Sequence, residues 1–358
     1  LCTANLPEPT IGANSLTQAD DHFNTVLFTG NGGTKAVTGL GFQPDWFWGK
    51  SRTNPSGVFS HSVYDSSRGV TKRLLPDLTN AESTTSGITS FDADGFTLGS
   101  NGGNNNNNAT YVNWCWKANG GTATASGSES GNNPAYSVQA NPTAGFSIVT
   151  YTGTGATGTV PHGLGVVPQM MIFKNRGSAG NWATYHGSNT AAPATDVIYL
   201  NLTNATADTV NMFNDTAPTS SVFTVDTNAN INEDGVAHVA YIFADVEGYS
   251  KFGGYTGNSN NDGSFVYTGF RPAMVMVKRT TGADSWFIYD IKRNSHNVMD
   301  KYLLADTSGA EATDASPLGL DMVSNGFKWR INSGARNTTG QTYIYMAFGD
   351  SFKYANAR

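Results

Sequence analysis

The sequence has little charge and almost no cysteine, and both shortages narrow the classes of protein it encodes. Asp, Glu, Lys and Arg make up 13% of its 358 residues, about half of the share in a typical soluble domain. The net charge is −6 and only isolated Lys-Arg doublets occur, which argues against nucleic acid as a partner because phosphate binding needs clustered Lys and Arg. For the two cysteines, Cys2 and Cys115, we expect a free pair, with a disulfide as the alternative.

Long apolar runs and long helix-forming runs are also missing. No apolar stretch approaches the roughly 20 residues that span a bilayer, and no signal peptide is recognisable. Runs of Ala, Leu, Glu, Lys and Arg, which long helices need, do not occur. The chain begins Leu-Cys-Thr without an initiator Met, so we do not expect residue 1 to be the natural start.

Catalytic patterns are absent from the sequence as well. There is no Gly-x-Ser-x-Gly, His-Glu-x-x-His, Walker loop or Cys-x-x-Cys, and the six histidines are scattered. Glycoside hydrolysis needs two carboxylates roughly 5–10 Å apart, and Asp65, Glu82 and Asp92 leave that alternative open. We nevertheless expect no catalytic residues and a protein that is not an enzyme.

The dominant feature that is present is a threefold internal repeat. The landmarks of the second copy, Gly153, Pro168, Tyr185, Phe223 and Tyr241, recur in the third copy with a predicted offset of 104 residues. From the first copy to the second the offset varies between 121 and 127. Because a constant offset is hard to produce by chance, the chain is predicted to consist of three homologous modules.

The repeat sets the expected boundaries. Residues 1–22 form an extended lead-in, residues 120–135 form a linker rich in Gly, Ser and Asn, and the three modules are residues 23–119, 136–250 and 251–358. Since no linker separates modules two and three, we expect them to form a stiffer pair than modules one and two.

Short runs of β-branched and aromatic residues, bounded by Gly, Pro or Asn, predict roughly seven or eight strands in each module. A repeated Gly-x-x-Pro precedes one of these strands, and it fits a turn in which Gly has a positive φ. The expected fold is therefore all-β, with three tandem β-sandwich (jelly-roll-like) modules.

The recurring aromatic-Tyr-Asp element is the best candidate for a site. A binding role would stack its ring on a sugar while the carboxylate accepts hydrogen bonds from hydroxyl groups. The alternative, which we favour, is a core tyrosine beside a carboxylate that pairs with Arg68 or Arg293. The candidate ligand-binding residues are Tyr64, Asp65, Tyr185, Tyr289 and Asp290, together with Asn106 of the Asn104–Asn108 loop.

Two further patterns carry weaker predictions. Lys50-x-Arg52 and Lys174-x-Arg176 follow apolar strands and are read as solvated strand ends, or alternatively as bridges to Asp65 or Glu82. The loops 230–235 and 258–263 match the opening half of a calcium loop but lack its glutamate at position twelve. We expect plain turns and no cofactor, with Ca²⁺ held partly by backbone carbonyls as the alternative.

Several strings resemble the uncharacterised tandem-repeat domain of marine and freshwater phage structural proteins. They include Val26-Leu-Phe-Thr-Gly-Asn-Gly32, Gly41-Phe-Gln-Pro-Asp-Trp46 and Ser90-Phe-Asp-Ala-Asp-Gly-Phe-Thr-Leu-Gly99. The resemblance implies a virion surface protein, a tail fibre or receptor-binding protein that contacts a host glycan or protein. It also implies other virion proteins as partners and, by analogy with phage fibres, a homotrimer. A capsid decoration or capsid-fibre protein and a polysaccharide depolymerase are the alternatives.

Because the repeated positions are mostly strand and turn positions, function is expected where the copies differ. The regions that differ are the Asn104–Asn108 loop, Ala191–Thr195 and the loop around Asn294–Asn297.

Overall fold

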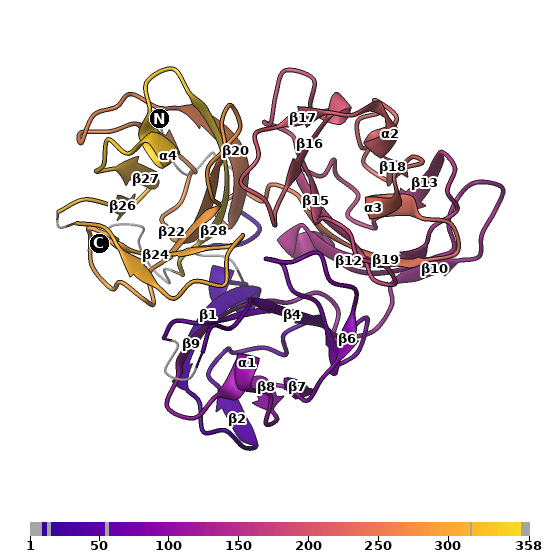
Figure 1. Cartoon of the computed structure of the whole chain (residues 1–358), viewed down its shortest axis with the longest axis horizontal. Coiled ribbons are helices and arrows are strands. Elements are labelled where there is room, and N and C mark those ends of the chain that lie inside the picture. Colours follow the sequence, from indigo (N-terminus) through magenta and orange to yellow (C-terminus); the bar gives the residue numbers. More distant parts are fainter. Residues whose placement is uncertain (1–8, 13–15, 54–56, 316, 352–358) are drawn as a thin grey trace.

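The computed structural model describes residues 9–12, 16–53, 57–315 and 317–351. The chain is an all-β protein built from antiparallel sheets, as the sequence predicts, with only short helical turns. Figure 1 shows three groups of strands arranged around a common centre. Within the described residues, each sheet takes its strands from one part of the chain.

The first group has a four-stranded main sheet in the order β1-β9-β3-β4. A smaller sheet, β2-β8-β7, and the pair β5-β6 complete it. The bounds are β1 (Phe23–Thr29), β2 (Lys35–Thr38), β3 (Trp46–Ser51), β4 (Ser62–Asp65), β5 (Lys72–Arg73), β6 (Ser83–Thr84), β7 (Ile88–Asp92), β8 (Gly95–Leu98) and β9 (Thr110–Trp116).

The second group has an eight-stranded sheet, β10-β11-β12-β19-β14-β15-β16-β17, and the pair β13-β18. The bounds are β10 (Ala125–Gly127), β11 (Tyr136–Asn141), β12 (Phe146–Thr152), β13 (Gly158–Pro161), β14 (Met170–Asn175), β15 (Ala183–His186), β16 (Asp196–Tyr199), β17 (Ala207–Asp208), β18 (Val222–Val225) and β19 (Ala237–Phe243).

The third group has a six-stranded sheet, β20-β28-β22-β23-β24-β25, and a smaller sheet, β21-β27-β26. The bounds are β20 (Ser250–Thr256), β21 (Phe265–Tyr267), β22 (Pro272–Arg279), β23 (Phe287–Asp290), β24 (Lys301–Leu304), β25 (Ala312–Thr313), β26 (Leu320–Val323), β27 (Gly326–Trp329) and β28 (Thr342–Gly349). The three main sheets share one pairing order, which is β1-β9-β3-β4, β12-β19-β14-β15 and β20-β28-β22-β23. The third strand of each main sheet is β3, β14 or β22 in this order.

Every helical segment among the described residues is a single short turn. The segments are η2 (Ala19–Asp21), α1 (Gly102–Asn105), η3 (Pro142–Ala144), η4 (Pro193–Thr195), α2 (Val210–Phe213), α3 (Ala229–Asn232) and α4 (Gly334–Asn337). α1, α3 and α4 each precede the last strand of a main sheet. The turn that the sequence places before the third strand has the predicted glycine geometry, since φ is +84° at Gly41, +75° at Gly165 and +88° at Gly269.

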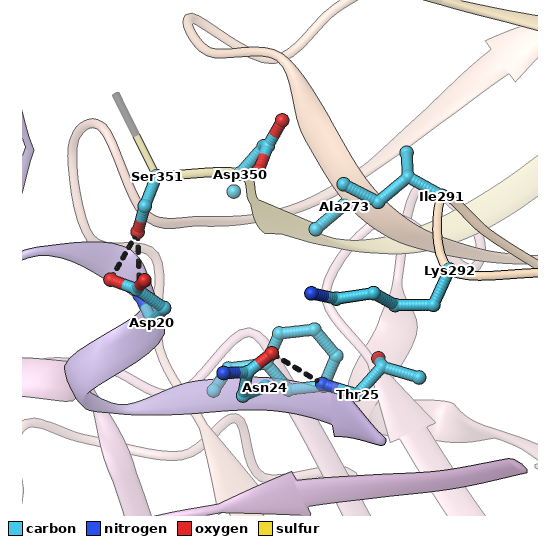
Figure 2. A pocket seen from close by; sticks show the side chains of 10 residues that line it. Asp20, Asn24, Thr25, Ala273, Ile291, Lys292, Asp350 and Ser351 are labelled. Carbon is cyan, nitrogen blue, oxygen red and sulfur yellow. Dashed lines mark hydrogen bonds between the residues drawn. The ribbon is translucent and has the colours of Figure 1, made fainter. Parts of the chain in front are cut away.

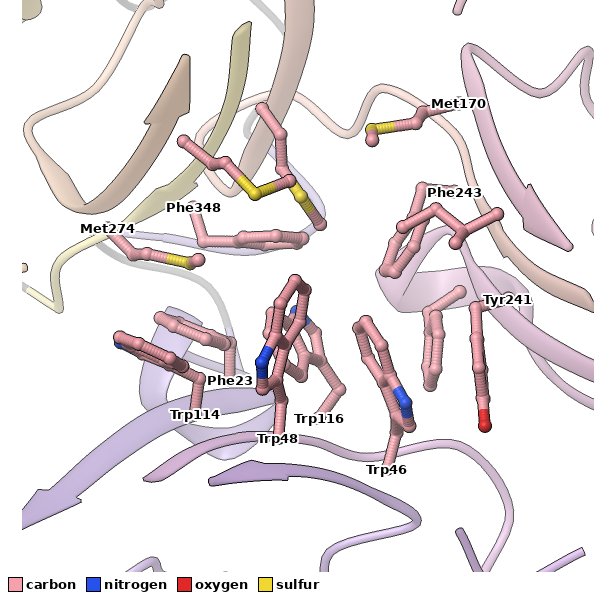
Figure 3. Packing of buried hydrophobic residues seen from close by; sticks show 14 of the residues in the cluster. Phe23, Trp46, Trp48, Trp114, Trp116, Met170, Tyr241, Phe243, Met274 and Phe348 are labelled. Atoms are coloured by element: carbon pink, nitrogen blue, oxygen red, sulfur yellow. The ribbon is translucent and has the colours of Figure 1, made fainter. Parts of the chain in front are cut away.

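The three main sheets turn one face toward a shared apolar core at the centre of the molecule. Figure 3 shows Trp46, Trp116, Phe243 and Phe348 gathered there from the three sheets. Six of the seven tryptophans belong to this cluster. The rings of Trp46 and Tyr241 stack with centroids 4.6 Å apart. No module could fold alone in this form without exposing its part of this core to water.

The opposite face of each main sheet packs on its own smaller sheet, and this gives three further apolar cores. Alternation along β3 shows how one strand serves both cores, because Trp46 and Trp48 face the centre while Phe47 faces the smaller sheet. Cys115 lies on the face opposite Trp114 and Trp116, and it is a buried free thiol. Cys2 lies outside the described residues.

The sheet registers correct one landmark of the repeat. Tyr241 lies opposite Ile172 in the second main sheet, and Met346 lies opposite Met276 in the third. Ile172 and Met276 are 104 residues apart, whereas Tyr241 and Met346 are 105 apart. The third copy has one additional residue between β27 and β28, and a shift of one residue moves a side chain to the other face of a strand. Tyr345, which the repeat pairs with Tyr241, therefore faces the outer core.

The segment 120–135, predicted as a linker, contains β10, which pairs with β11. The amides of Gly120 and Gly121 donate to the Asp45 carboxylate at 3.0 and 2.9 Å. In the lead-in, Ile11 is fully buried in the central core. The described residues of both segments therefore pack on the three main sheets or bond to them.

Candidate functional site at the seams between modules

The repeated polar residues meet at three seams, where neighbouring modules touch. We name them the 1–2, 2–3 and 3–1 seams after the predicted modules. One lysine from each module, Lys50, Lys174 and Lys278, lies fully buried at the end of the third strand of its main sheet.

Each of these lysines donates a hydrogen bond to a backbone carbonyl of a neighbouring module. Lys174 Nζ lies 3.0 Å from Thr79 O and Lys278 Nζ lies 2.8 Å from Thr203 O. Lys50 Nζ lies 3.1 Å from Ser308 O. The three contacts run from module two to one, three to two and one to three, so the modules form a closed ring. Burial lowers the pKa of each lysine to about 8.

A ring N–H in each module makes a similar contact. Its acceptor is a backbone carbonyl earlier in the same loop of the neighbouring module. Trp182 Nε1 donates to Leu75 O at 2.9 Å and Trp286 Nε1 donates to Tyr199 O at 3.0 Å. At the 3–1 seam, His61 Nε2 makes the bond of 3.0 Å to Leu304 O.

Trp48 Nε1 donates to the other nitrogen of His61 at 2.9 Å, which assigns the proton to Nε2. Burial holds the pKa of His61 well below its usual value. The neutral histidine therefore links Trp48 of module one to the Leu304 carbonyl of module three by hydrogen bonds at both ring nitrogens.

The predicted site residue Asp65 forms a buried network at the 1–2 seam. Its carboxylate accepts from Arg68 Nε at 2.5 Å and from the Tyr241 hydroxyl of module two at 2.6 Å. Glu82 accepts from Arg68 and from Arg176 of module two, each at 2.8 Å. Burial would raise the pKa of Glu82, but the hydrogen bonds and charges of the two arginines hold it below its usual value.

Asp290 forms the corresponding network at the 3–1 seam. Its carboxylate accepts from Arg293 Nε and from Trp114 Nε1 of module one, the latter at 3.1 Å. Glu311 makes a bidentate pair with Arg52 of module one, with both distances 2.9 Å. Module one thus takes part in a charged network with each of its neighbours.

The 2–3 seam has the same geometry without the charges. Its corresponding residues are His186, Asn189, Thr206, Thr280 and Met346. His186 Nε2 donates to Tyr345 O at 3.1 Å, and Thr206 Oγ1 donates to Asn189 Oδ1 at 2.6 Å. Burial lowers the pKa of His186 to about 4. All five replacements occur together, so at these positions the seam has neutral hydrogen bonds in place of ion pairs, beside the bond from Lys278 to Thr203 O.

The proposed ligand-binding role of the repeated element meets a physical obstacle. Tyr64, Asp65 and Tyr289 have no exposed surface, and Asp290 and Tyr185 have 1% and 4%. The Tyr64 hydroxyl bonds to Thr85 and Asn104, and the Tyr289 hydroxyl accepts from Arg336. A ring that is buried on both faces cannot stack on a sugar from solvent, so these residues support the fold.

Asn106, the sixth candidate, is partly exposed at the end of α1. Its backbone amide donates to the Tyr111 hydroxyl at 2.8 Å. Of the six candidates it alone is more than marginally exposed.

The arginine pairs are confirmed, whereas the bridging alternative for the strand-end residues holds for Arg176 and not for the two lysines. Arg68 and Arg293 pair with Asp65 and Asp290, as the favoured alternative predicts. Arg176 bridges to Glu82, as predicted for the bridging alternative, whereas Lys50 and Lys174 are not solvated. The buried amine of Lys50 donates to three backbone carbonyls, and that of Lys174 donates to two.

Sequence reasoning missed one buried asparagine in each module. Asn105, Asn232 and Asn337 have no exposed surface, and each accepts a hydrogen bond from the amide that follows the repeated Thr-Gly. Each lies six residues before the repeated position Tyr111, His238 or Tyr343. That constant spacing is the signal from which they were predictable.

The two calcium-like loops use the same asparagines. Asn232 Nδ2 donates to Ala156 O and Asn337 Nδ2 donates to Asn260 O, at 2.8 and 2.9 Å. Within the described residues no three His, Cys, Asp or Glu side chains are placed to hold a metal ion. The Asn232 side chain and the Asn260 carbonyl oxygen are thus engaged in holding the turns.

A polar pocket of about 110 Å³ opens at the 3–1 seam. Figure 2 shows Lys292 extending into it from module three, between Ala273 and Asn24. Ser351 and Asp20 close one side through two hydrogen bonds. At the other two seams the chain itself crosses from module to module, through residues 117–122 and 244–250. At the 3–1 seam no segment of the described chain runs directly from one module into the other, and the pocket lies there.

The fold and the seams define an all-β protein in which one chain closes three sheets around a shared core. The chain belongs to the family described as Domain of unknown function (DUF7483), which matches residues 18–351. The match runs from η2 to β28, so all three sheets lie within one family unit. No curated protein matches the chain. None of the helices in the described part of the chain is long and apolar enough to cross a membrane.

Proposed function

We propose that the chain is a non-enzymatic structural protein of a phage virion surface, a tail fibre or receptor-binding protein. The observation that supports this proposal is the closed ring of seam contacts. The most repeated polar groups of the chain, including the three buried lysines, bind neighbouring modules, and their role is cohesion. The resemblance of the repeated strings to phage structural proteins supplies the virion setting.

The role would be to carry recognition loops on a rigid body. The central core and the three outer cores fix the sheets, and the loops that differ between the modules lie at strand ends. Exposed polar and aromatic side chains in such loops suit contacts with a host glycan or protein.

The proposal is tested by locating the protein in purified particles. An antibody against the chain should label the tail of the phage that encodes it, in negative-stain images. Label on the head would replace the tail-fibre role with capsid decoration, and absence of the chain from purified particles would remove the virion role altogether.

The capsid decoration role has one observation in its favour. A single chain presents three similar sheets around one centre (Figure 1), which suits a seat on a threefold position of a shell. The depolymerase alternative is tested separately. Incubation with polysaccharide from the host should leave the chain length of the polymer unchanged, and shortened chains would overturn the non-enzymatic proposal.

A homotrimer is part of the proposal and needs its own measurement. Two further chains would have to pack on outer surfaces, because the central core is already enclosed within one chain. Light scattering after size exclusion should then give three times the monomer mass of 37.9 kDa. A mass equal to the monomer would show that the ring within one chain suffices.

A further inference from the structure

Two neighbouring aromatic side chains on β21 face the solvent. Phe265 has 49% and Tyr267 has 65% of its surface exposed, while Val266 between them is buried. Successive side chains of a strand point to opposite faces, so both rings lie on the outer face of the small sheet. Their spacing along the strand is about 7 Å.

The same positions of the other modules carry no aromatic residue. Val37, Val160 and Val266 correspond, because they pair with Phe96, Phe223 and Phe327 in their sheets. The flanking residues are Ala36 and Thr38 in module one, and Thr159 and Pro161 in module two. The fold therefore forms without the aromatic pair, which is specific to module three.

Both rings rest against glycines. A Cβ atom on Gly269 would lie 3.6 Å from the Tyr267 hydroxyl, and one on Gly326 would lie 3.1 Å from the Phe265 ring. This support restricts the rings before any ligand arrives, which lowers the entropic cost of binding.

A hollow of about 330 Å³ adjoins Tyr267. Asp245, Glu247, Lys251 and Thr268 line it together with the turn between modules two and three. Lys251 contacts one oxygen of Asp245, and the other oxygen accepts from Phe252 N at 2.9 Å. Carboxylate and ammonium groups together accept and donate hydrogen bonds, so this pair can bind adjacent hydroxyl groups.

We propose that this surface binds a neutral glycan, with a hexose against Tyr267 and its hydroxyl groups on Asp245 and Lys251. The apolar face of a pyranose ring packs on an aromatic ring, and the next sugar reaches Phe265 along the strand. Two carboxylates and one ammonium line the hollow, so its charge disfavours acidic sugars. The inference rests on the proposed receptor-binding function and gives it a ligand class and a location.

The test is saturation-transfer NMR and titration calorimetry on the whole chain, with methyl hexosides, neutral disaccharides and a methyl uronide as probes. We expect a neutral sugar to bind, and Tyr267→Ala to weaken it at least about tenfold. Lys251→Met should also weaken binding, and Val210→Ala, which changes an exposed apolar residue elsewhere, should leave it unchanged. Equal thermal midpoints would show that the variants are folded.

Three outcomes would overturn the inference: no binding by any neutral probe, full affinity in Tyr267→Ala, or preference for the uronide. Binding to the isolated chain is independent of the particle. A chain that binds neutral sugar but is absent from virions would refute the proposed function alone, and a virion protein that binds none would refute this inference alone.

Discussion

The hydroxyl of Tyr241 donates a hydrogen bond of 2.6 Å to the carboxylate of Asp65, across the boundary between the second and first modules. Trp114 makes the same kind of bond to Asp290 from the first module to the third. The two carboxylates lie at corresponding positions of the repeat. Each accepts one hydrogen bond from an arginine of its own module and one from an aromatic residue of a neighbouring module. The same carboxylates therefore hold the buried arginines and join neighbouring modules.

Removal of either carboxylate should be among the most destabilising single changes in the chain. Asp65→Ala and Asp290→Ala each leave a fully buried arginine without its closest partner. Breaking a buried pair in this way costs about 3–5 kcal/mol, which equilibrium denaturation measures. The matched control is Asp262→Ala, because Asp262 has a largely exposed side chain paired with Lys328. The control should cost about 0–1 kcal/mol, and equal losses in all three variants would contradict the assigned roles.

The three buried lysines predict that stability rises from pH 8 to pH 9. Their folded pKa of about 8 lies below the ordinary value of 10.5. In this range the unfolded chain holds more protons than the folded chain, so the free energy of unfolding increases with pH. Toward pH 10 the buried tyrosines act in the opposite direction, because burial raises the pKa of Tyr151, Tyr241 and Tyr249 well above the ordinary value. Denaturation at pH 8, 8.5 and 9 checks the sign. Lys174→Met should reduce the slope, and a flat or falling curve in the parent chain would refute the prediction.

His186 predicts a loss of stability in acid. Burial lowers its folded pKa to about 4 from 6.5, so the folded chain excludes a proton that the unfolded chain binds. The free energy of unfolding should therefore fall as the pH decreases from 6.5 toward 4. Other buried histidines with lowered pKa values, such as His61 and His238, act in the same direction.

The share of His186 is measured with His186→Gln, which keeps a neutral donor at the 2–3 seam. This variant should show a shallower pH dependence between pH 6.5 and 5 than the parent chain. An unchanged slope would mean that His186 gains a proton without cost in the folded state.

The hydrogen bonds between Asp20 and Ser351 predict that the chain tolerates circular permutation. A short Gly-Ser linker joining these two positions, with new ends between Ser128 and Glu129, cuts an exposed connection after β10 and leaves the seam contacts in place. The permuted chain lacks the residues before Asp20, including Ile11 and Ala19 of the central core, so it should unfold in one calorimetric transition at a lower midpoint than the parent chain. The same linker with new ends between Trp48 and Gly49 divides β3 and should abolish folding. Two separate transitions in the first permutant would show that the ring is not one cooperative body.

The sequence predicts the strands, the positive φ of Gly41, Gly165 and Gly269, and the pairs of Arg68 and Arg293 because these depend on residues close in the chain. The burial of Lys50, Lys174 and Lys278 could not be foreseen. Their partner carbonyls lie 258, 95 and 75 residues away, and only closure of the ring brings them near. The landmark at Tyr345 was wrong for a local reason, because one additional loop residue reverses the face that a strand side chain takes.

The aromatic pair of β21 was also out of reach. A repeat draws attention to what the copies share, whereas Phe265 and Tyr267 are informative because the copies differ there. Their exposure depends on the small sheet having no layer outside it, which local sequence does not reveal.

The missing chain crossing at the 3–1 seam has a mechanical consequence. A pulling force applied at residues 20 and 351 first loads the Asp20–Ser351 bonds and the contacts of this seam, and it bypasses the strands of the second module. The polypeptide itself bridges the other two seams, so they can open only after the first one has parted. Under tension, the molecule should therefore yield in an order fixed by its connectivity, with the 3–1 seam as its first point of rupture.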